Sequence, residues 1–397
     1  MAHSPRANIC RWLYTIAILS YLADSMLVPF YPQYFKTVYG VDSPLISGAY
    51  IAACRIGMLI SFQFWSRLTN RFSVMRILCL TQGIAGGISL LCAVAPTVGW
   101  FMAFSVLADI FKSSYLLLYP HIIRTAGRDR EGSVISYMAL IANLGIVLSV
   151  LIGGTLLDRV DARMAIVAVA ILDWVQMLIS LHIRSRESDS ALAVAASRER
   201  NRSNAATTLA CLCAMMFMFY FSLVSLRPFY TSFIESQHPA VSMTSAGIIF
   251  IIPNMMAVLL APWGQRITTN AKIRDVLIWS CSFVGLCTIL QSAAGSLLFL
   301  VASRVVYGAA LFIVEIALDY LLFRWSREKE LITNYSYINL SQNAAIILAP
   351  LAASYSIYGL SMDGPFVLST LGAMLTVGIV CLFFARRSGV IDPYLAS

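Results

Sequence analysis

The chain has 397 residues, of which 59% are hydrophobic and 12% are charged, and its formal net charge is +9. This composition excludes an ordinary soluble domain, because a globular core cannot bury so large an apolar fraction. Apolar runs long enough to cross roughly 30 Å of hydrocarbon recur twelve times, which predicts an all-α integral membrane protein with 12 transmembrane helices. The predicted spans are residues 12–35, 45–65, 76–95, 99–120, 133–156, 162–183, 206–230, 245–263, 275–294, 296–323, 333–356 and 364–385.

The basic residues are distributed unevenly between the two sets of loops. An even number of spans puts both termini on one side, and the segments of that side carry 21 of the 28 Lys and Arg residues. The opposite loops carry three, which are Lys36, Arg159 and Arg163. The positive-inside rule therefore predicts a multi-pass protein of a cytoplasmic (inner) membrane with both termini in the cytoplasm. Because the basic residues are scattered over short loops, nucleic acid is not an expected partner.

Several kinds of chemistry have no support in the sequence. All nine cysteines lie in or beside apolar spans, where cysteine usually packs as a small hydrophobic residue. The four histidines lie at span ends or in loops, and no ligand cluster for a metal is evident. No glycine-rich phosphate-binding loop occurs, so an ATP-driven motor is not indicated. The sequence predicts neither an enzyme nor a cofactor.

The chain repeats itself at an offset of about 200 residues. Residues 27–31 (Leu-Val-Pro-Phe-Tyr) return as residues 226–230 (Leu-Arg-Pro-Phe-Tyr), and Pro29 and Pro228 are expected to loosen their helices. One sizeable polar connector, residues 184–205, separates six spans from six. This predicts an N-terminal six-helix bundle (1–183), a cytoplasmic linker (184–205) and a C-terminal six-helix bundle (206–397). Two similar halves around a cavity are how transporters alternate access.

Two sequence motifs point to one family. Residues 66–76, between spans 2 and 3, contain Leu68, Asn70 and Arg71. The segment resembles the loop signature of the major facilitator superfamily, Gly-x-Leu-Ala-Asp-Arg-x-Gly-Arg-Arg, and residues 264–274 occupy the corresponding place in the second half. In that family the charges of this loop latch the two halves shut on the cytoplasmic side. Asn70 stands where the family has a carboxylate, so the latch is expected to be weaker or built differently.

The second motif lies in span 5. Gly145, Gly153 and Gly154 fall in a segment similar to the superfamily's antiporter motif, Gly-x-x-x-Gly-Pro-x-x-Gly-Gly. Span 11 repeats the segment and retains the proline as Pro350. Small residues four apart let helices approach closely and slide, and ordinary helix packing is the alternative explanation.

Nine ionisable residues fall inside the predicted spans. Each costs about 2.5–3.5 kcal/mol at mid-membrane, so nine unpaired charges would cost on the order of 25 kcal/mol. That exceeds the stability of a typical domain, about 5–15 kcal/mol. These residues are therefore expected to be paired, neutralised or exposed to a wet cavity, and they are the best candidates for a site: Asp24, Arg55, Asp109, Lys112, Asp173, Arg227, Arg304, Glu315 and Asp319.

Four of these residues form two candidate pairs. Asp24 and Arg55 lie halfway along spans 1 and 2, so a pair at equal depth is expected. It is either a structural ion pair or a switch in which Asp24 takes up a proton and releases Arg55. Asp109 and Lys112 are three apart and share a helix face. They either neutralise each other or form a proton or substrate site, in which Lys112 stands in for the family's usual cavity arginine.

The remaining charges offer less. Arg304 begins a segment resembling the family's Arg-x-x-x-Gly pattern, here in span 10. Glu315 and Asp319 are four apart on one face, and Asp319 is expected to contact Arg324 or loop arginines. Asp173 has no obvious partner in the sequence. Arg227 lies in the outer part of span 7, from where its side chain is able to reach the membrane surface.

The resemblance implies a secondary transporter. The expected mechanism is proton-coupled antiport, in which protons neutralise Asp24 or Asp109 and a small drug-like or siderophore-like molecule is exported. Proton symport of an anionic nutrient or a metal chelate uses the same residues and remains an alternative. A non-transporting sensor or scaffold is a third. The expected partners are the small-molecule substrate, protons and the lipid bilayer, and the protein is expected to be monomeric.

Overall fold

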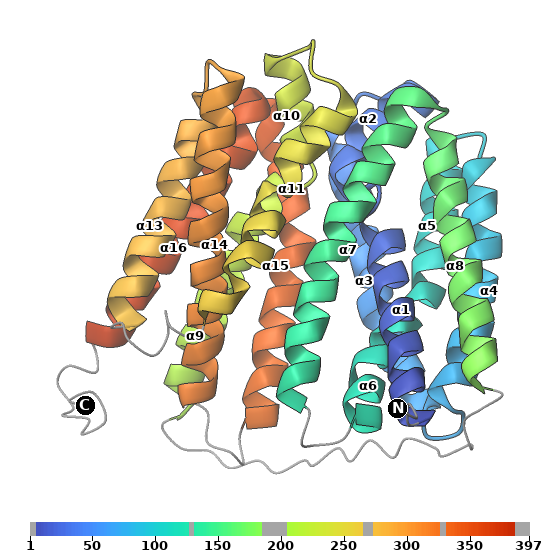
Figure 1. Cartoon of the computed structure of the whole chain (residues 1–397). Coiled ribbons are helices and arrows are strands. Elements are labelled where there is room, and N and C mark those ends of the chain that lie inside the picture. The colour runs from blue at the N-terminus through green and yellow to red at the C-terminus, as the bar shows by residue number, and fades with distance from the viewer. Residues whose placement is uncertain (1–4, 127–130, 185–204, 265–272, 326–330, 386–397) are drawn as a thin grey trace. The chain divides into compact units, whose positions relative to one another are not determined.

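The computed structural model describes residues 5–126, 131–184, 205–264, 273–325 and 331–385. In this part of the chain every regular element is a helix (Figure 1). Eleven helical stretches there are long and apolar enough to cross a membrane. The stretch Ser336–Ala385 contains two helices, α15 (Leu331–Leu360) and α16 (Gly364–Ala385), joined by a short 3-10 turn at Ser361–Asp363. The predicted all-α membrane fold of 12 helices is confirmed.

The chain divides into two compact units. The first consists of residues Met1–Ser197 and Ile234–Asn254, and the second of Arg198–Phe233 and Met255–Ser397. The predicted linker, residues 184–205, lies outside the described residues except at its two ends. The predicted division into bundles of residues 1–183 and 206–397 stays a prediction.

The helices of the first unit follow the chain in order. They are α1 (Pro5–Ser25), α2 (Tyr31–Tyr39), α3 (Pro44–Leu68), α4 (Val74–Ala93), α5 (Val98–Lys112), α6 (Leu118–Ala126), α7 (Glu131–Arg159) and α8 (Arg163–Arg184), with most of α11 (Met243–Leu260). α4 lies against α8 and α5, α1 lies against α7 and α8, and α3 lies against α5 (Figure 1). The unit is thus packed mainly around α1 and α4.

The second unit is organised around α9 and α13. α9 (Ala205–Leu226) packs against α15 and α16. α13 (Ile273–Ser292) packs against α14 (Leu297–Trp325) and α16. The short helix α10 (Tyr230–Gln237) follows α9 and passes from the second unit to the first.

Three of the predicted spans are broken rather than continuous. α1 ends at Ser25, and a 3-10 turn at Val28–Phe30 precedes α2. α9 ends at Leu226, and α10 begins at Tyr230. Pro29 and Pro228 lie in these two breaks, as expected, because proline removes a helix hydrogen-bond donor. The third break, the 3-10 turn η2 (Ser113–Leu117) between α5 and α6, has no proline in it and was not predicted.

The third break keeps its backbone hydrogen-bonded. The indole of Trp65 donates to the Ile110 carbonyl at 2.7 Å, and the Ser113 hydroxyl donates to the same oxygen at 2.8 Å. A backbone carbonyl without a partner is very unfavourable inside a membrane. These two donors therefore allow α5 to change to a 3-10 turn in the interior of the unit.

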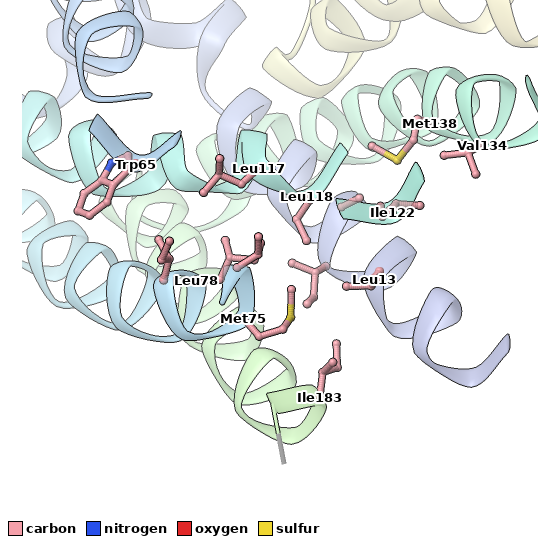
Figure 2. Close-up of a cluster of buried hydrophobic side chains, with 14 residues drawn as sticks. Leu13, Trp65, Met75, Leu78, Leu117, Leu118, Ile122, Val134, Met138 and Ile183 are labelled. Atoms are coloured by element: carbon pink, nitrogen blue, oxygen red, sulfur yellow. The ribbon is translucent and has the colours of Figure 1, made fainter. Parts of the chain in front are cut away.

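A cluster of buried apolar side chains fills one end of the first unit (Figure 2). It joins Leu13 of α1, Trp65 of α3, Leu78 of α4 and Ile122 of α6, with Ile183 from the end of α8. Leu13, Leu78 and Ile122 have no solvent exposure. Val134 and Met138 of α7 also belong to it, so the cluster holds together six helices and fixes the frame in which the charged residues are placed.

Candidate functional site

The first unit contains a polar cavity of about 80 Å³. One water needs roughly 10–15 Å³ of such space, so the cavity is large enough for several. Its walls come from α1, the α1–α2 break, α2, α3, α4, α5 and α8. The lining residues are Ala23, Asp24, Leu27, Val28, Tyr31, Tyr50, Ile51, Cys54, Arg55, Ser89, Cys92, Ser105, Ala108, Asp109, Lys112, Ile166 and Val169. Four of the predicted site residues, from three helices, therefore face one space.

Asp24 and Arg55 form the predicted pair. Arg55 Nη2 lies 3.4 Å from Asp24 Oδ2, and the two side chains keep 30% and 19% of their surface exposed, for Arg55 and Asp24 respectively. Asp24 occupies the last turn of α1, immediately before the break, and Arg55 lies in the interior of α3. The pair therefore ties the end of a broken helix to a continuous one, and it remains accessible from the cavity.

Lys112 is paired differently from the expectation. Its ammonium lies 2.9 Å from Asp173 Oδ2 on α8, and the Asp173 residue is only 1% exposed. The hydroxyl of Ser89 on α4 donates to the same carboxylate oxygen at 3.3 Å. Asp173, which had no obvious partner in the sequence, is thus the counter-charge of Lys112. Self-neutralisation of Asp109 by Lys112 alone does not describe the site.

Asp109 has a different environment from the other two carboxylates. Among the described residues it makes no ion pair within 4.0 Å, and it shares the cavity wall with Cys54 of α3. Lys112, one turn further along the same helix, is close enough for an electrostatic interaction. Lys112 is therefore close to two acids: it is paired with Asp173, and in the described part of the chain Asp109 has no cation of its own.

Hydroxyl groups hold the break that follows Lys112. Ser113 is 2.7 Å from the Ser61 hydroxyl of α3, and Ser114 is 2.6 Å from the Thr81 hydroxyl of α4. Both serines are fully buried. The turn η2 is thus braced on two sides, and the position of Lys112 depends on helices α3, α4 and α8.

The second unit places Arg304 in an aromatic environment. Its guanidinium lies 3.9 Å from the ring centre of Tyr230 and 4.9 Å from that of Tyr307. The residue is 4% exposed, and its Nη1 donates to the Gln291 side-chain oxygen at 3.4 Å. The Tyr230 hydroxyl donates to the same oxygen at 2.9 Å. Cation–π contacts of this kind favour a buried guanidinium.

The other charges of the second unit lie near one another. Glu315 interacts electrostatically with Arg227 and with Asp319. Arg227 lies in the break between α9 and α10, and Glu315 lies in the interior of α14. The side chain of Arg324, the expected partner of Asp319, lies outside the described residues.

The glycines of the antiporter-like motif mark close helix contacts. A Cβ at Gly153 of α7 would overlap the Met26 carbonyl oxygen in the α1–α2 break, and one at Gly145 would lie 2.6 Å from the Tyr21 Cβ atom. A Cβ at Gly154 would lie 2.9 Å from the Cα atom of Thr244 at the start of α11. The motif therefore brings α7 against the broken helix. Pro350 lies buried inside α15.

The start of α11 is held by a carboxylate that the sequence did not single out. Asp158, at the end of α7, accepts hydrogen bonds from the backbone amides of Met243 and Thr244 at 2.8 and 2.7 Å and from the Thr244 hydroxyl at 2.6 Å. A carboxylate at a helix N-terminus satisfies amides that lack helical partners.

The residues of the loop motif lie at the surface of the first unit. Leu68 ends α3, and Asn70 and Arg71 are exposed in the turn before α4. Residues 265–272 of the corresponding second-half loop lie outside the described residues.

Sequence reasoning missed the neutral members of the cavity. Cys54, Ser89 and Tyr50 carry no intramembrane charge and match no motif, so nothing distinguished them from packing residues. Tyr31 and Tyr230 were visible as the last position of the repeated segment at residues 27–31 and 226–230. The structure places Tyr31 at the cavity and Tyr230 against Arg304, so the repeat carried a signal for both.

Comparisons with known proteins agree with this architecture. The family model described as Major Facilitator Superfamily matches residues 13–290 and, in a second match, residues 212–393. A sequence search of curated proteins found no match.

Solved structures of low sequence identity share the fold. The crystal structure of the nucleoside transporter NupG is 15% identical, with a TM-score of 0.73 over 95% of this chain and 98% of that one. A bacterial homolog of the human lysosomal transporter Spinster is 12% identical, with a TM-score of 0.77 over 97% and 98%. A bacterial homologue of the iron transporter ferroportin is 11% identical, with a TM-score of 0.73 over 96% and 99%.

These findings fix the class of the protein. Its helices, its length and the family match describe a multi-pass membrane protein that acts as a secondary transporter of a small molecule and not as an enzyme. The chain belongs to the major facilitator superfamily.

Proposed function

We propose that this protein is a proton-coupled antiporter that exports a small organic molecule, drug-like or siderophore-like, by alternating access. The observation that supports this proposal best is the charged cavity of the first unit, which has Asp24, Arg55, Asp109 and Lys112 in its walls. Ionisable residues inside a membrane protein are unfavourable unless they pair or serve a transport pathway. In a secondary transporter, protonation of a carboxylate is a direct way to change which helices are tied together.

The geometry supports this coupling because the charges lie at helix breaks. Asp24 precedes the break in the first span, and Lys112 precedes the break in the fourth. Protonation at Asp24 or Asp109 changes the ion pairs next to these breaks, and the broken helices then move while the continuous helices α3, α4 and α8 stay in place. Discontinuous helices with charged residues beside them are typical of coupling sites in secondary transporters.

The substrate is proposed from charge rather than from fold. By their names, the structures that share this fold belong to a nucleoside transporter, a homolog of a lysosomal transporter and a homologue of an iron transporter, so the fold does not select one substrate. A lipophilic cation would find counter-charges in Asp24 and Asp109. A carboxylate-bearing ligand such as a siderophore would interact with the intramembrane cations, Arg304 and Arg227 among them.

The cellular arrangement follows from the distribution of basic residues. This distribution favours a cytoplasmic (inner) membrane with both termini in the cytoplasm. The protein is proposed to be a monomer, because one chain already holds both halves of a transporter. Its two six-helix bundles, residues 1–183 and 206–397, are joined by the cytoplasmic linker 184–205. The protons that drive export enter from the opposite side of the membrane.

The experiment uses purified full-length protein in proteoliposomes with a pH-sensitive dye inside. Lipophilic cationic drugs, carboxylate siderophores and organic acids are added in turn under an imposed proton gradient. At least one ligand is expected to evoke proton movement opposite to its own. A variant with both Asp24→Asn and Asp109→Asn is expected to reduce this movement to the level of protein-free liposomes.

Asp42→Asn is the matched control. Asp42 is 71% exposed and pairs with Lys36 outside the cavity, so this variant is expected to retain wild-type coupling. Proton movement in the same direction as the substrate would instead establish symport and import. Substrate transport that ignores the proton gradient would refute proton coupling.

A further inference from the structure

The charges around the cavity of the first unit do not balance. Three carboxyl groups, Asp24, Asp109 and Asp173, meet two cations, Arg55 and Lys112. The two ion pairs use both cations, one with Asp24 and one with Asp173. If every group is ionised, the cluster carries one excess negative charge, and that charge belongs to Asp109.

The other groups around Asp109 do not supply the missing charge. The ionisable groups that interact electrostatically with Asp109 are Asp24 of α1, Tyr31 of α2, Tyr50, Cys54 and Arg55 of α3, Cys92 of α4, Lys112 of its own helix and Tyr115 of η2. Apart from Asp24, Arg55 and Lys112, which are already counted above, they are neutral phenols and thiols, and these become charged only as anions. An unbalanced carboxylate inside a membrane protein is unfavourable, which favours uptake of one positive charge.

We propose that Asp109 is the residue that binds the coupling proton, and that Asp24–Arg55 and Lys112–Asp173 are the ion pairs around it. This proposal rests on the proton coupling proposed above and assigns it to one carboxyl group. The cavity supplies the water through which a proton reaches Asp109. Cys54 lines the same cavity as Asp109.

The geometry also gives the proton something to control. Asp109 and Lys112 share a helix face, so an ionised Asp109 competes with Asp173 for the Lys112 ammonium. With the proton on Asp109, Lys112 stays on Asp173 at 2.9 Å and ties α5 to α8. When the proton leaves to water, the Asp109 carboxylate attracts the Lys112 ammonium away from Asp173. The ion pair between α5 and α8 is then weaker next to the break at Ser113.

The test measures protonation directly and needs no substrate. Full-length protein in lipid is titrated with acid and base while its infrared spectrum is recorded, in choline chloride buffer. The carbonyl stretch of a protonated carboxyl group is expected in the wild type, lost in Asp109→Asn, shifted but present in Asp109→Glu, and unshifted in Asp24→Glu and Asp173→Glu, which keep the charge count of the cluster. Gel filtration of each variant verifies that it is folded before its spectrum is used.

Each other outcome overturns the assignment. Retention of the full wild-type signal in Asp109→Asn would mean that the proton is held elsewhere, and a shift of the signal in Asp24→Glu would place it in the first span. Displacement of the signal by NaCl at constant pH would identify the cation as Na⁺. Because the measurement reads protonation without transport, a failure of antiport in proteoliposomes and a failure of this assignment give separate results.

Discussion

At the residue scale, the ion pairs of the first unit differ in how much water reaches them. Asp173 is 1% exposed and its pair with Lys112 is short, whereas Arg55 and Asp24 face the cavity and lie 3.4 Å apart. A buried charge that loses its partner has no solvent to compensate it. Lys112 and Asp173 are therefore expected to matter for stability, and Asp24 and Arg55 to matter more for conformational change.

Lys112→Met is expected to destabilise the protein by about 3–5 kcal/mol, because Asp173 is left as a buried charge. Adding Asp173→Asn to this variant is expected to recover most of the loss, because the uncompensated charge disappears. Unfolding of the purified protein in detergent measures both changes. The exposed pair Lys36–Asp42 is the control, since breaking it is expected to change stability by less than about 1 kcal/mol. Equal losses at the two pairs would contradict the prediction.

The residue scale also shows where sequence reasoning succeeded. Asp24 and Arg55 lie at equal depth on consecutive antiparallel spans, and a depth argument was sufficient to pair them. Asp173 lies on the sixth span and Lys112 on the fourth. Their contact depends on the rotation of α5 and α8 about their axes, which span boundaries do not specify. That is why Asp173 had no partner in the sequence.

At the element scale, the breaks in the helices determine where the charges lie. Proline explains two of them, at residues 25–30 and 226–230. The break at η2 depends on hydroxyl groups and on Trp65, which belong to neighbouring helices. The glycines of α7 then allow this helix to lie directly against the first break. Local sequence and helix packing thus act together on the same segment.

Gly153→Ala is expected to destabilise the first unit by about 1–3 kcal/mol, because the added Cβ would overlap the Met26 carbonyl and push α7 away from the break. Thermal unfolding in detergent measures the loss. Gly87→Ala, in α4, is the matched control. A Cβ there meets no atom within 4 Å, so this variant is expected to be neutral or up to about 1 kcal/mol more stable. Destabilisation by both substitutions would point to a general loss of helix flexibility instead.

At the scale of the whole molecule, the loops determine the orientation in the membrane. The 21-to-3 distribution of basic residues favours cytoplasmic termini, and the positive-inside rule applies to short loops such as these. The orientation is a property of the whole chain, because each loop adds a small contribution to it in the same direction.

Green fluorescent protein fused after Ser397 is expected to fluoresce in intact bacterial cells, since it folds in the cytoplasm and not after export in unfolded form. Alkaline phosphatase fused at the same residue is expected to be inactive. A fusion that ends in the loop at residues 159–163, between α7 and α8, is expected to give the reverse pattern. Fluorescence from the loop fusion and phosphatase activity from the C-terminal fusion would invert the topology.

The sequence by itself determined the membrane class, the 12 helices, the family and the list of intramembrane charges. These properties depend on composition, on segment length and on local motifs, all of which are read along the chain. Only the tertiary structure decided which charges meet, that Asp173 holds Lys112, that Cys54 and Asp109 line one cavity, and that Asp158 holds the start of α11. The physical reason is that contacts between helices depend on their rotation and crossing, and these are fixed by packing among residues distant in sequence.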